Sequence, residues 1–231
     1  MKNQIITTGI VLARTDFQEA DRILTLLTHD KGKLRVIAKG VRRPRSKLAG
    51  GIELFSVSEL SVLPGRGELG TLISSRLKKH YGDIVNDINR TMLGYDLLKR
   101  MNRLTEDAAG EEYFDVLNAA LAGLDDSTLA PELTEMWFTM QLLKVTGHAP
   151  NLKTDVNGAR LEADAAYIFD FDAMAFHRQE NGPFTAGHIK LMRLGYGIES
   201  PEVLKQVTGA AEAAPDTLKL VKDIIRLHVR I

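Results

Sequence analysis

The chain has 231 residues, of which 44% are hydrophobic and 26% are charged, a composition typical of a folded globular protein. It contains no cysteine, which excludes disulfide bonds and any thiolate metal site. Neither a secretory h-region nor an uninterrupted run of about 20 apolar residues is present. We therefore expect a cytoplasmic protein without a membrane span.

Positive charge is concentrated in the first third of the chain, although 30 basic and 30 acidic residues make the whole chain neutral. Residues 1–80 hold 15 Lys and Arg against 7 Asp and Glu, a net charge of +8, so residues 81–231 carry −8. Eight cations lie between Lys31 and Lys47, with no acid between Asp30 and Glu53. This asymmetry favours a nucleic acid or another polyphosphate as the ligand of the first region; the alternative is an ordinary solvated charge run.

Residues 4–80 predict β-structure, because β-branched residues and Leu recur there with a period of two. Turn residues stand at Asp30–Gly32 and at Pro64–Gly67, and the long third connection spans Gly40–Glu53. Five short strands with such a connection suit a small closed barrel, which removes exposed strand edges. The expected strands are 5–15, 21–28, 33–39, 54–63 and 69–78.

The cations divide between the third expected strand and the loop after it. Alternation along that strand places Lys33, Arg35 and Lys39 on one face, and Leu34 and Val36 on the other. The remaining cations lie on a loop expected to be flexible. The predicted nucleic-acid-binding residues are Lys33, Arg35, Lys39, Arg42, Arg43, Arg45 and Lys47.

After Tyr81 the apolar residues recur at intervals of three and four, which is typical of amphipathic helices. Residues 148–183 lose this period and are expected to form a small irregular lobe with one hairpin. The fold class is therefore α+β multidomain, with a barrel domain over 1–80 and a helical domain over 81–231 that contains the lobe. The expected helices are 92–104, 113–124, 131–146, 185–196, 200–208 and 214–229.

Two patterns suggest enzymatic chemistry, but neither is supported by its surroundings. Gly65–Gly70 matches G-x-G-x-x-G, yet the following residues alternate as a strand, whereas a dinucleotide site needs a helix there. Asp170, Asp172 and His177 are candidate metal ligands, but Phe169 and Phe171 alternate with the aspartates as in a half-exposed strand. We expect no enzyme; a metal-dependent enzyme using this acidic pair remains an alternative.

The segment Gly32–Ser46, GKLRVIAKGVRRPRS, followed by Glu53-Leu54-Phe55, resembles the bacterial RecO family of DNA-repair proteins. The first domain of that family carries G-K-x4-A-K-G-x-R-R-x-x-S and then a hydrophobic-x-Phe strand. Gly147–Leu152 matches a later family segment. The resemblance implies an N-terminal OB-fold and a helical C-terminal domain with a small inserted lobe.

The resemblance also implies a function in DNA repair and recombination by the RecF pathway. Family members bind single- and double-stranded DNA, anneal complementary strands and, with RecR, help RecA replace single-stranded-DNA-binding protein. The helical domain of the family contacts the acidic, hydrophobic-ended tail of that protein. Lys222 and Arg226 are four residues apart on the last expected helix, beside Leu218 and Ile225, and are the predicted contacts for this tail.

One departure from the family concerns metal. Many members hold zinc in the lobe with four cysteines, and the matching positions here are Thr154, Asn157, Phe176 and Gln179. None of these is an effective zinc ligand. We therefore expect a lobe without zinc that is held together by packing.

The aromatic content of the first region bears on how nucleic acid would be bound. Phe17 and Phe55 are its only aromatic residues before Tyr81, and Phe55 is at a strand position expected to be buried. Base stacking should then be minor and binding mainly electrostatic. An RNA-binding OB module on a helical scaffold is the alternative, which matched DNA and RNA oligomers would separate.

Overall fold

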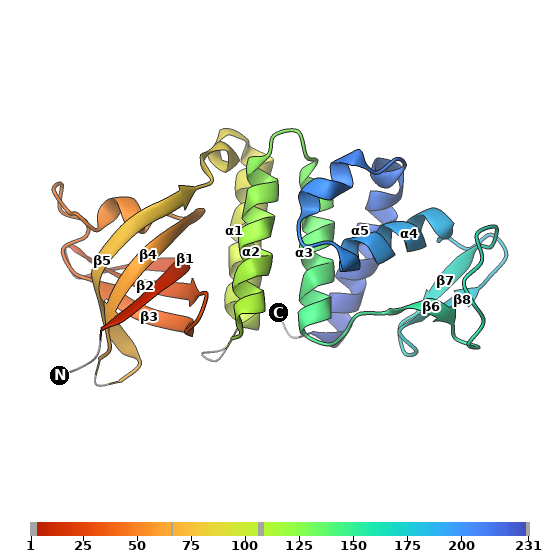
Figure 1. Cartoon of the computed structure of the whole chain (residues 1–231), viewed down its shortest axis with the longest axis horizontal. Coiled ribbons are helices and arrows are strands. Elements are labelled where there is room, and N and C mark those ends of the chain that lie inside the picture. The colour runs from red at the N-terminus through yellow and green to blue at the C-terminus, as the bar shows by residue number, and fades with distance from the viewer. Residues whose placement is uncertain (1–3, 66, 106–108, 230–231) are drawn as a thin grey trace. The chain divides into compact units, whose positions relative to one another are not determined.

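The computed structural model describes residues 4–65, 67–105 and 109–229 (Figure 1). The chain forms two compact units, Met1–Asp125 and Asp126–Ile231. In the described ranges, the first contains a β-barrel and two α-helices, and the second contains three α-helices and a small sheet, with short 3-10 helices in both. Among the described residues, no helix combines the length and the apolar character needed to span a membrane.

The first unit begins with the predicted five-stranded closed barrel, of the OB type (Figure 1). The order around it is β1-β2-β3-β5-β4, and β1 pairs with β4 to close it. The β3–β5 pair is parallel and the others are antiparallel. The strands are β1 (Ile5–Phe17), β2 (Asp21–Thr28), β3 (Gly32–Ala38), β4 (Ser56–Leu63) and β5 (Leu69–His80).

The barrel forms because alternate residues of each strand are apolar. Leu24 and Leu26 on β2 and Val36 on β3 are fully buried in its core. The glycines after β4 form a hairpin turn into β5, as predicted, and no helix follows them. A Cβ on Gly65 would lie 2.0 Å from the carbonyl oxygen of Leu69, so the turn requires glycine there.

Two helices complete the first unit: α1 (Ile88–Leu104) and α2 (Glu111–Asp125), preceded by the short helix η2 (Gly82–Asn86). The Asp87 side chain accepts a hydrogen bond from Arg90 N–H and so caps α1. The helix therefore begins four residues before the predicted start at residue 92. The helices pack on each other and on β1, and α2 also contacts β2. They thus belong to the same compact unit as the barrel.

The second unit is built around α3 (Pro131–Val145), which contacts α4 (Ala186–Gly197), the short helix η3 (Pro201–Gln206) and α5 (Ala210–His228). Every residue from 133 to 143 is buried, so α3 is surrounded on all sides. The predicted core residues Met136, Trp137 and Met140 lie at its centre, as expected.

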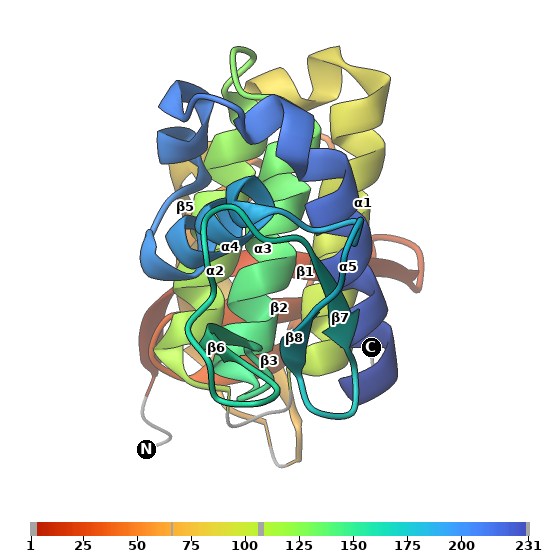
Figure 2. The same cartoon turned by 90° about the vertical axis from the view of Figure 1, so that its right-hand side faces the viewer.

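The lobe between α3 and α4 is a three-stranded sheet (Figure 2). The expected hairpin is β7 (Tyr167–Asp170) with β8 (Ala175–Arg178), and β6 (Asn151–Asp155) adds to it by pairing parallel to β8. Aromatic rings fill its interior. Phe176, at one of the positions that match a zinc-binding cysteine, is fully buried and makes edge contacts with Tyr167, Phe169 and Phe184.

Candidate nucleic-acid interface

The cationic loop between β3 and β4, residues 39–53, is anchored at both ends and is not a free loop. At its start, Gly40 N–H donates to the carboxylate of Asp21 (2.7 Å), and Val41 is buried in the barrel core. Near its end, Ser75 Oγ donates to the carbonyl oxygen of Leu48 (2.9 Å), and Ile52 is fully buried. The segment in between is therefore presented from a rigid base beside β5.

Three of the predicted cations project from this loop into solvent: Arg43, Arg45 and Lys47. Arg35 and Lys39 are likewise exposed on β3 and at its end. Within the described part of the chain, none of these five residues has a carboxylate within 4.0 Å. Their charges are consequently available to an anionic ligand.

Arg42 is exposed but shares its charge with a neighbour. Its Nη1 lies 3.5 Å from Asp16, which also accepts a hydrogen bond from Arg22 Nε at 2.7 Å. That bond from Arg22, together with the positive charge of Arg42, lowers the pKa of Asp16 below its usual value. Asp16 therefore stays ionised and offsets part of the Arg42 charge.

Lys33 already has partners within the protein. Its half-buried ammonium group donates to the backbone carbonyl oxygens of Asn102 (3.1 Å) and Thr105, at the C-terminal end of α1. A cation there is favoured, because the last carbonyls of a helix carry partial negative charge. Lys33 therefore makes structural contacts within the unit, which distinguishes it from the other six predicted residues.

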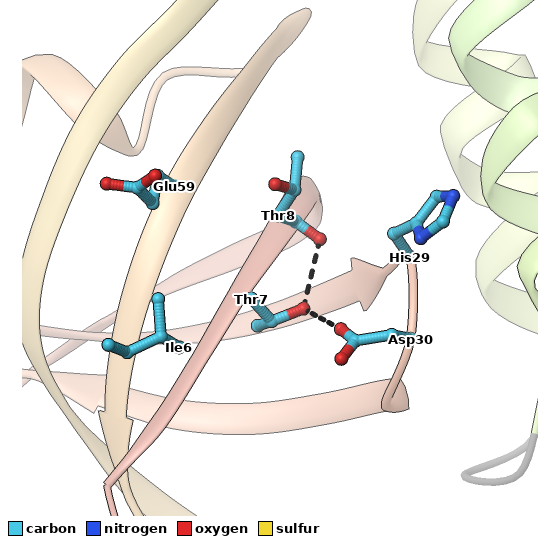
Figure 3. Close-up of a pocket in the computed structure, with 6 residues that line it drawn as sticks. All are labelled: Ile6, Thr7, Thr8, His29, Asp30 and Glu59. Atoms are coloured by element: carbon cyan, nitrogen blue, oxygen red, sulfur yellow. Dashed lines mark hydrogen bonds between the residues drawn. The ribbon is translucent and has the colours of Figure 1, made fainter.

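The opposite end of the barrel holds several carboxylates around a pocket. Figure 3 shows a pocket lined by Ile6, Thr7, Thr8, His29, Asp30 and Glu59, in which Thr7 Oγ1 donates to Asp30. This hydrogen bond, followed by the one from Lys31, lowers the pKa of Asp30. His29 lies 3.9 Å from the carboxylates of Glu111 and Asp115 on α2. Phosphates would be repelled by these carboxylates.

Sequence reasoning missed a second group of cations near the loop. Arg76, Lys78 and Lys79 are exposed on β5, immediately after Ser75, which contacts the loop. Lys78 pairs with Glu59 at 2.9 Å, and Lys79 Nζ lies 4.6 Å from the centre of the Tyr81 ring. Three cations in four residues were a visible signal, but only the tertiary contact with Leu48 relates them to the loop.

In the second unit, Lys222 and Arg226 have different surroundings. Lys222 Nζ forms a 2.7 Å ion pair with Glu135 on α3, and Ile225 is buried with 2% of its surface exposed. Arg226 is exposed and lies 3.6 Å from Asp223. Ile225 therefore does not offer an open pocket wall, and Arg226 is the more accessible of the two cations.

The acidic residues of the lobe have structural contacts. The carboxylate of Asp170 accepts hydrogen bonds from the N–H groups of Asp172 and Ala173, which closes the turn between β7 and β8. His177 is exposed on β8. Across the described residues, no three His, Cys, Asp or Glu side chains converge as a metal site would require.

These features define the class of the first unit: an OB-type barrel with a cationic loop next to strands β2 and β3, the usual ligand-binding face of this fold. The comparisons with known proteins extend the assignment to the whole chain. The family model "Recombination protein O N terminal" matches residues 1–81, and "Recombination protein O C terminal" matches residues 86–231. The chain belongs to the recombination protein O (RecO) family, as its resemblance predicted.

Several relatives carry the name DNA repair protein RecO. The protein from Dehalococcoides mccartyi is 33% identical over 152 residues, which cover 65% of this chain and 59% of the relative. The protein from Syntrophus aciditrophicus is 27% identical, covering 93% of this chain and 87% of the relative. That from Halalkalibacterium halodurans is 26% identical, covering 95% and 86%. The match thus spans less than two thirds of the first relative and most of the other two.

Proposed function

We propose that this protein is a DNA-binding recombination mediator of DNA repair, which works by binding and positioning strands in the cytoplasm, at the nucleoid. The observation that carries the proposal is the set of five exposed cations without carboxylate partners in the described structure: Arg35, Lys39, Arg43, Arg45 and Lys47. They lie on β3, at its end and on the loop that follows it, in an OB-type barrel of a member of the RecO family.

The contacts that these residues can make are mainly with phosphate. Lys and Arg on a loop neutralise the backbone of single and double strands alike, and carry little sequence information. Phosphate contacts leave the edges of the bases unoccupied. A strand held in this way remains able to pair, which suits the annealing of complementary strands.

The partners follow from family membership and remain part of the proposal. With RecR, the protein would promote RecA loading on DNA coated with single-stranded-DNA-binding protein, whose acidic tail would bind the second unit. Arg226 is the exposed candidate for this tail, and Lys222 would have to exchange Glu135 for it.

A tail-peptide titration separates these two cations. Arg226→Glu should weaken peptide binding and leave binding of naked DNA unchanged. Glu135→Gln removes the carboxylate that pairs with Lys222, so it should strengthen peptide binding if Lys222 takes part. Unchanged peptide affinity in both variants would place the partner surface elsewhere.

The central test of the function is an annealing assay on complementary oligonucleotides, with and without single-stranded-DNA-binding protein. We expect faster annealing by the wild-type protein in both conditions, and none by a variant whose loop cations are reversed. Matched RNA oligomers provide the comparison with the alternative function. A clear preference for RNA would indicate recognition of the 2′-hydroxyl and favour an RNA-binding module instead.

A further inference from the structure

The barrel has an exposed aromatic residue at the tip of the β1–β2 hairpin. Phe17 exposes 39% of its surface, whereas Phe55 and Tyr81, the other aromatic residues of the described ranges 4–65 and 67–81, expose 2% and 1%. An isolated exposed apolar side chain is common on protein surfaces and needs no explanation by itself. Its neighbours make this one informative.

The strand register places Phe17 on the outer face of the barrel. Thr15 pairs with Ile23, and Ile23 pairs with Ile37, on the side opposite to the buried residues Leu24 and Val36. Phe17 is two residues beyond Thr15, so its side chain points to the same outer side. The half-buried Ile23 and Ile37 face the same outer side as Phe17.

The same face carries free cations. Arg35 lies two residues before Ile37 on β3, and Lys39 lies two residues after it. Phe17 pairs with Asp21, whose carboxylate accepts a hydrogen bond from Gly40 N–H, so the hairpin tip lies beside the strand end that carries Lys39. An exposed ring, two half-buried isoleucines and two cations that have no carboxylate within 4.0 Å in the described structure thus share one surface.

The charges at the tip indicate which part of a nucleotide would lie there. Asp16 is paired with Arg22 and Arg42, but Glu19 is exposed in the turn. A negative charge in the turn, two residues after Phe17, disfavours a phosphate there. The tip is therefore suited to a base, while Arg35 and Lys39 are suited to the flanking phosphates.

We propose that the exposed outer face of the barrel around Phe17, Arg35 and Lys39 is a site for single-stranded nucleic acid, in which Phe17 stacks on an unpaired base. This stacking site rests on the proposed function and makes it more specific. The loop cations attract any nucleic acid, whereas the ring discriminates, because the bases of a duplex are already stacked and cannot reach it. Base stacking then has a larger role than the aromatic content of the sequence suggested.

The test compares single strands and duplexes of equal length by fluorescence anisotropy. Phe17→Ala should lower the affinity for an oligo-dT strand by about 5- to 100-fold, the range of one lost base–aromatic stack. Its affinity for duplex should stay within about twofold, and the salt dependence should not change, because no phosphate contact is lost. Phe17→Trp should retain single-strand affinity, and its added fluorescence should be quenched by the strand.

Ile6→Ala is the matched control. Ile6 lies on the same strand, exposes 67% of its surface and pairs with Ser61 on β4, away from the proposed site. Replacing Ile6 should change the affinity for neither the single strand nor the duplex. An equal loss for both DNA forms in Phe17→Ala, or no loss, overturns the stacking site while leaving the proposed function intact. A wild-type protein that binds neither form overturns both.

Discussion

Both ends of β3 carry cations, but the surroundings of these cations differ. At the Gly32 end, Lys31 lies 3.1 Å from Asp30, and Lys33 donates to carbonyl oxygens at the end of α1. At the Ala38 end, Arg43, Arg45 and Lys47 project from an anchored loop and have no carboxylate within 4.0 Å in the described structure. At one end the cations therefore have partners within the unit, and at the other they remain available. The density of charge along a sequence does not distinguish these cases.

The largest effect is expected from reversing the free cations. Arg43→Glu, Arg45→Glu and Lys47→Glu together should weaken binding to a single strand by about 100-fold or more. If each residue contacts one phosphate, the slope of log affinity against log salt should become shallower by about 2, at 0.7 per contact. The thermal unfolding midpoint should change little, because exposed charges contribute little to stability.

The control for this prediction compares single variants from the two ends. Arg45→Glu and Lys31→Glu change the net charge equally, but only the former should weaken binding. Equal losses would mean that the overall charge of the barrel, and not the loop, determines affinity.

The next largest effect is expected on the free energy of unfolding, from Lys33 at the Gly32 end of β3. Lys33→Met should lower the free energy of unfolding by about 1–3 kcal/mol, since two carbonyl oxygens lose a charged donor. Urea titration measures this free energy of unfolding, which Lys31→Met should change by less than about 0.5 kcal/mol. If Lys33→Met instead weakens DNA binding and leaves stability unchanged, Lys33 belongs to the interface.

A smaller gain of binding is expected from Asp16→Asn. The substitution frees Arg42 from its 3.5 Å ion pair, so affinity for DNA should rise about two- to fivefold at low salt, consistent with the modest energy of a surface pair. Asp30→Asn makes the same charge change in the acidic pocket and should have no effect. A rise in DNA affinity in both variants would again indicate that affinity depends on net charge.

The smallest effect is expected on the pKa of Asp30, which lines the pocket of Figure 3. The folded-state pKa of Asp30 is depressed below the ordinary 3.8, so this group stabilises the fold above that pH, and the contribution is lost as the pH falls through the folded-state pKa. Thr7→Val removes the main hydrogen bond and should raise the pKa of Asp30, which NMR titration of its carboxyl can follow. A pKa that does not move would show that Thr7 is not its cause.

Local sequence patterns predicted much of this molecule. The alternation that buries Leu24, Leu26 and Val36 depends only on the period of two in a strand, so the barrel strands could be predicted to within two residues. The motif over Gly32–Ser46 correctly indicated the family. The start of α1 was misplaced because the apolar period begins at Met92, whereas the first turn carries a single exposed apolar residue, Ile88; the capping residue Asp87 was the better signal.

The tertiary structure alone decided which charged and aromatic residues are available. Lys33 and Thr105 are 72 residues apart, and Lys222 and Glu135 lie on different helices, so no local period relates them. The parallel pairing of β6 with β8 and the hydrogen bond from Gly40 to Asp21, which brings the β1–β2 hairpin to the end of β3, are likewise non-local. A residue's type and its neighbours in sequence determine whether it faces the core or the solvent. Whether an exposed cation meets a carboxylate, a carbonyl or only water depends on segments that chain folding brings to it.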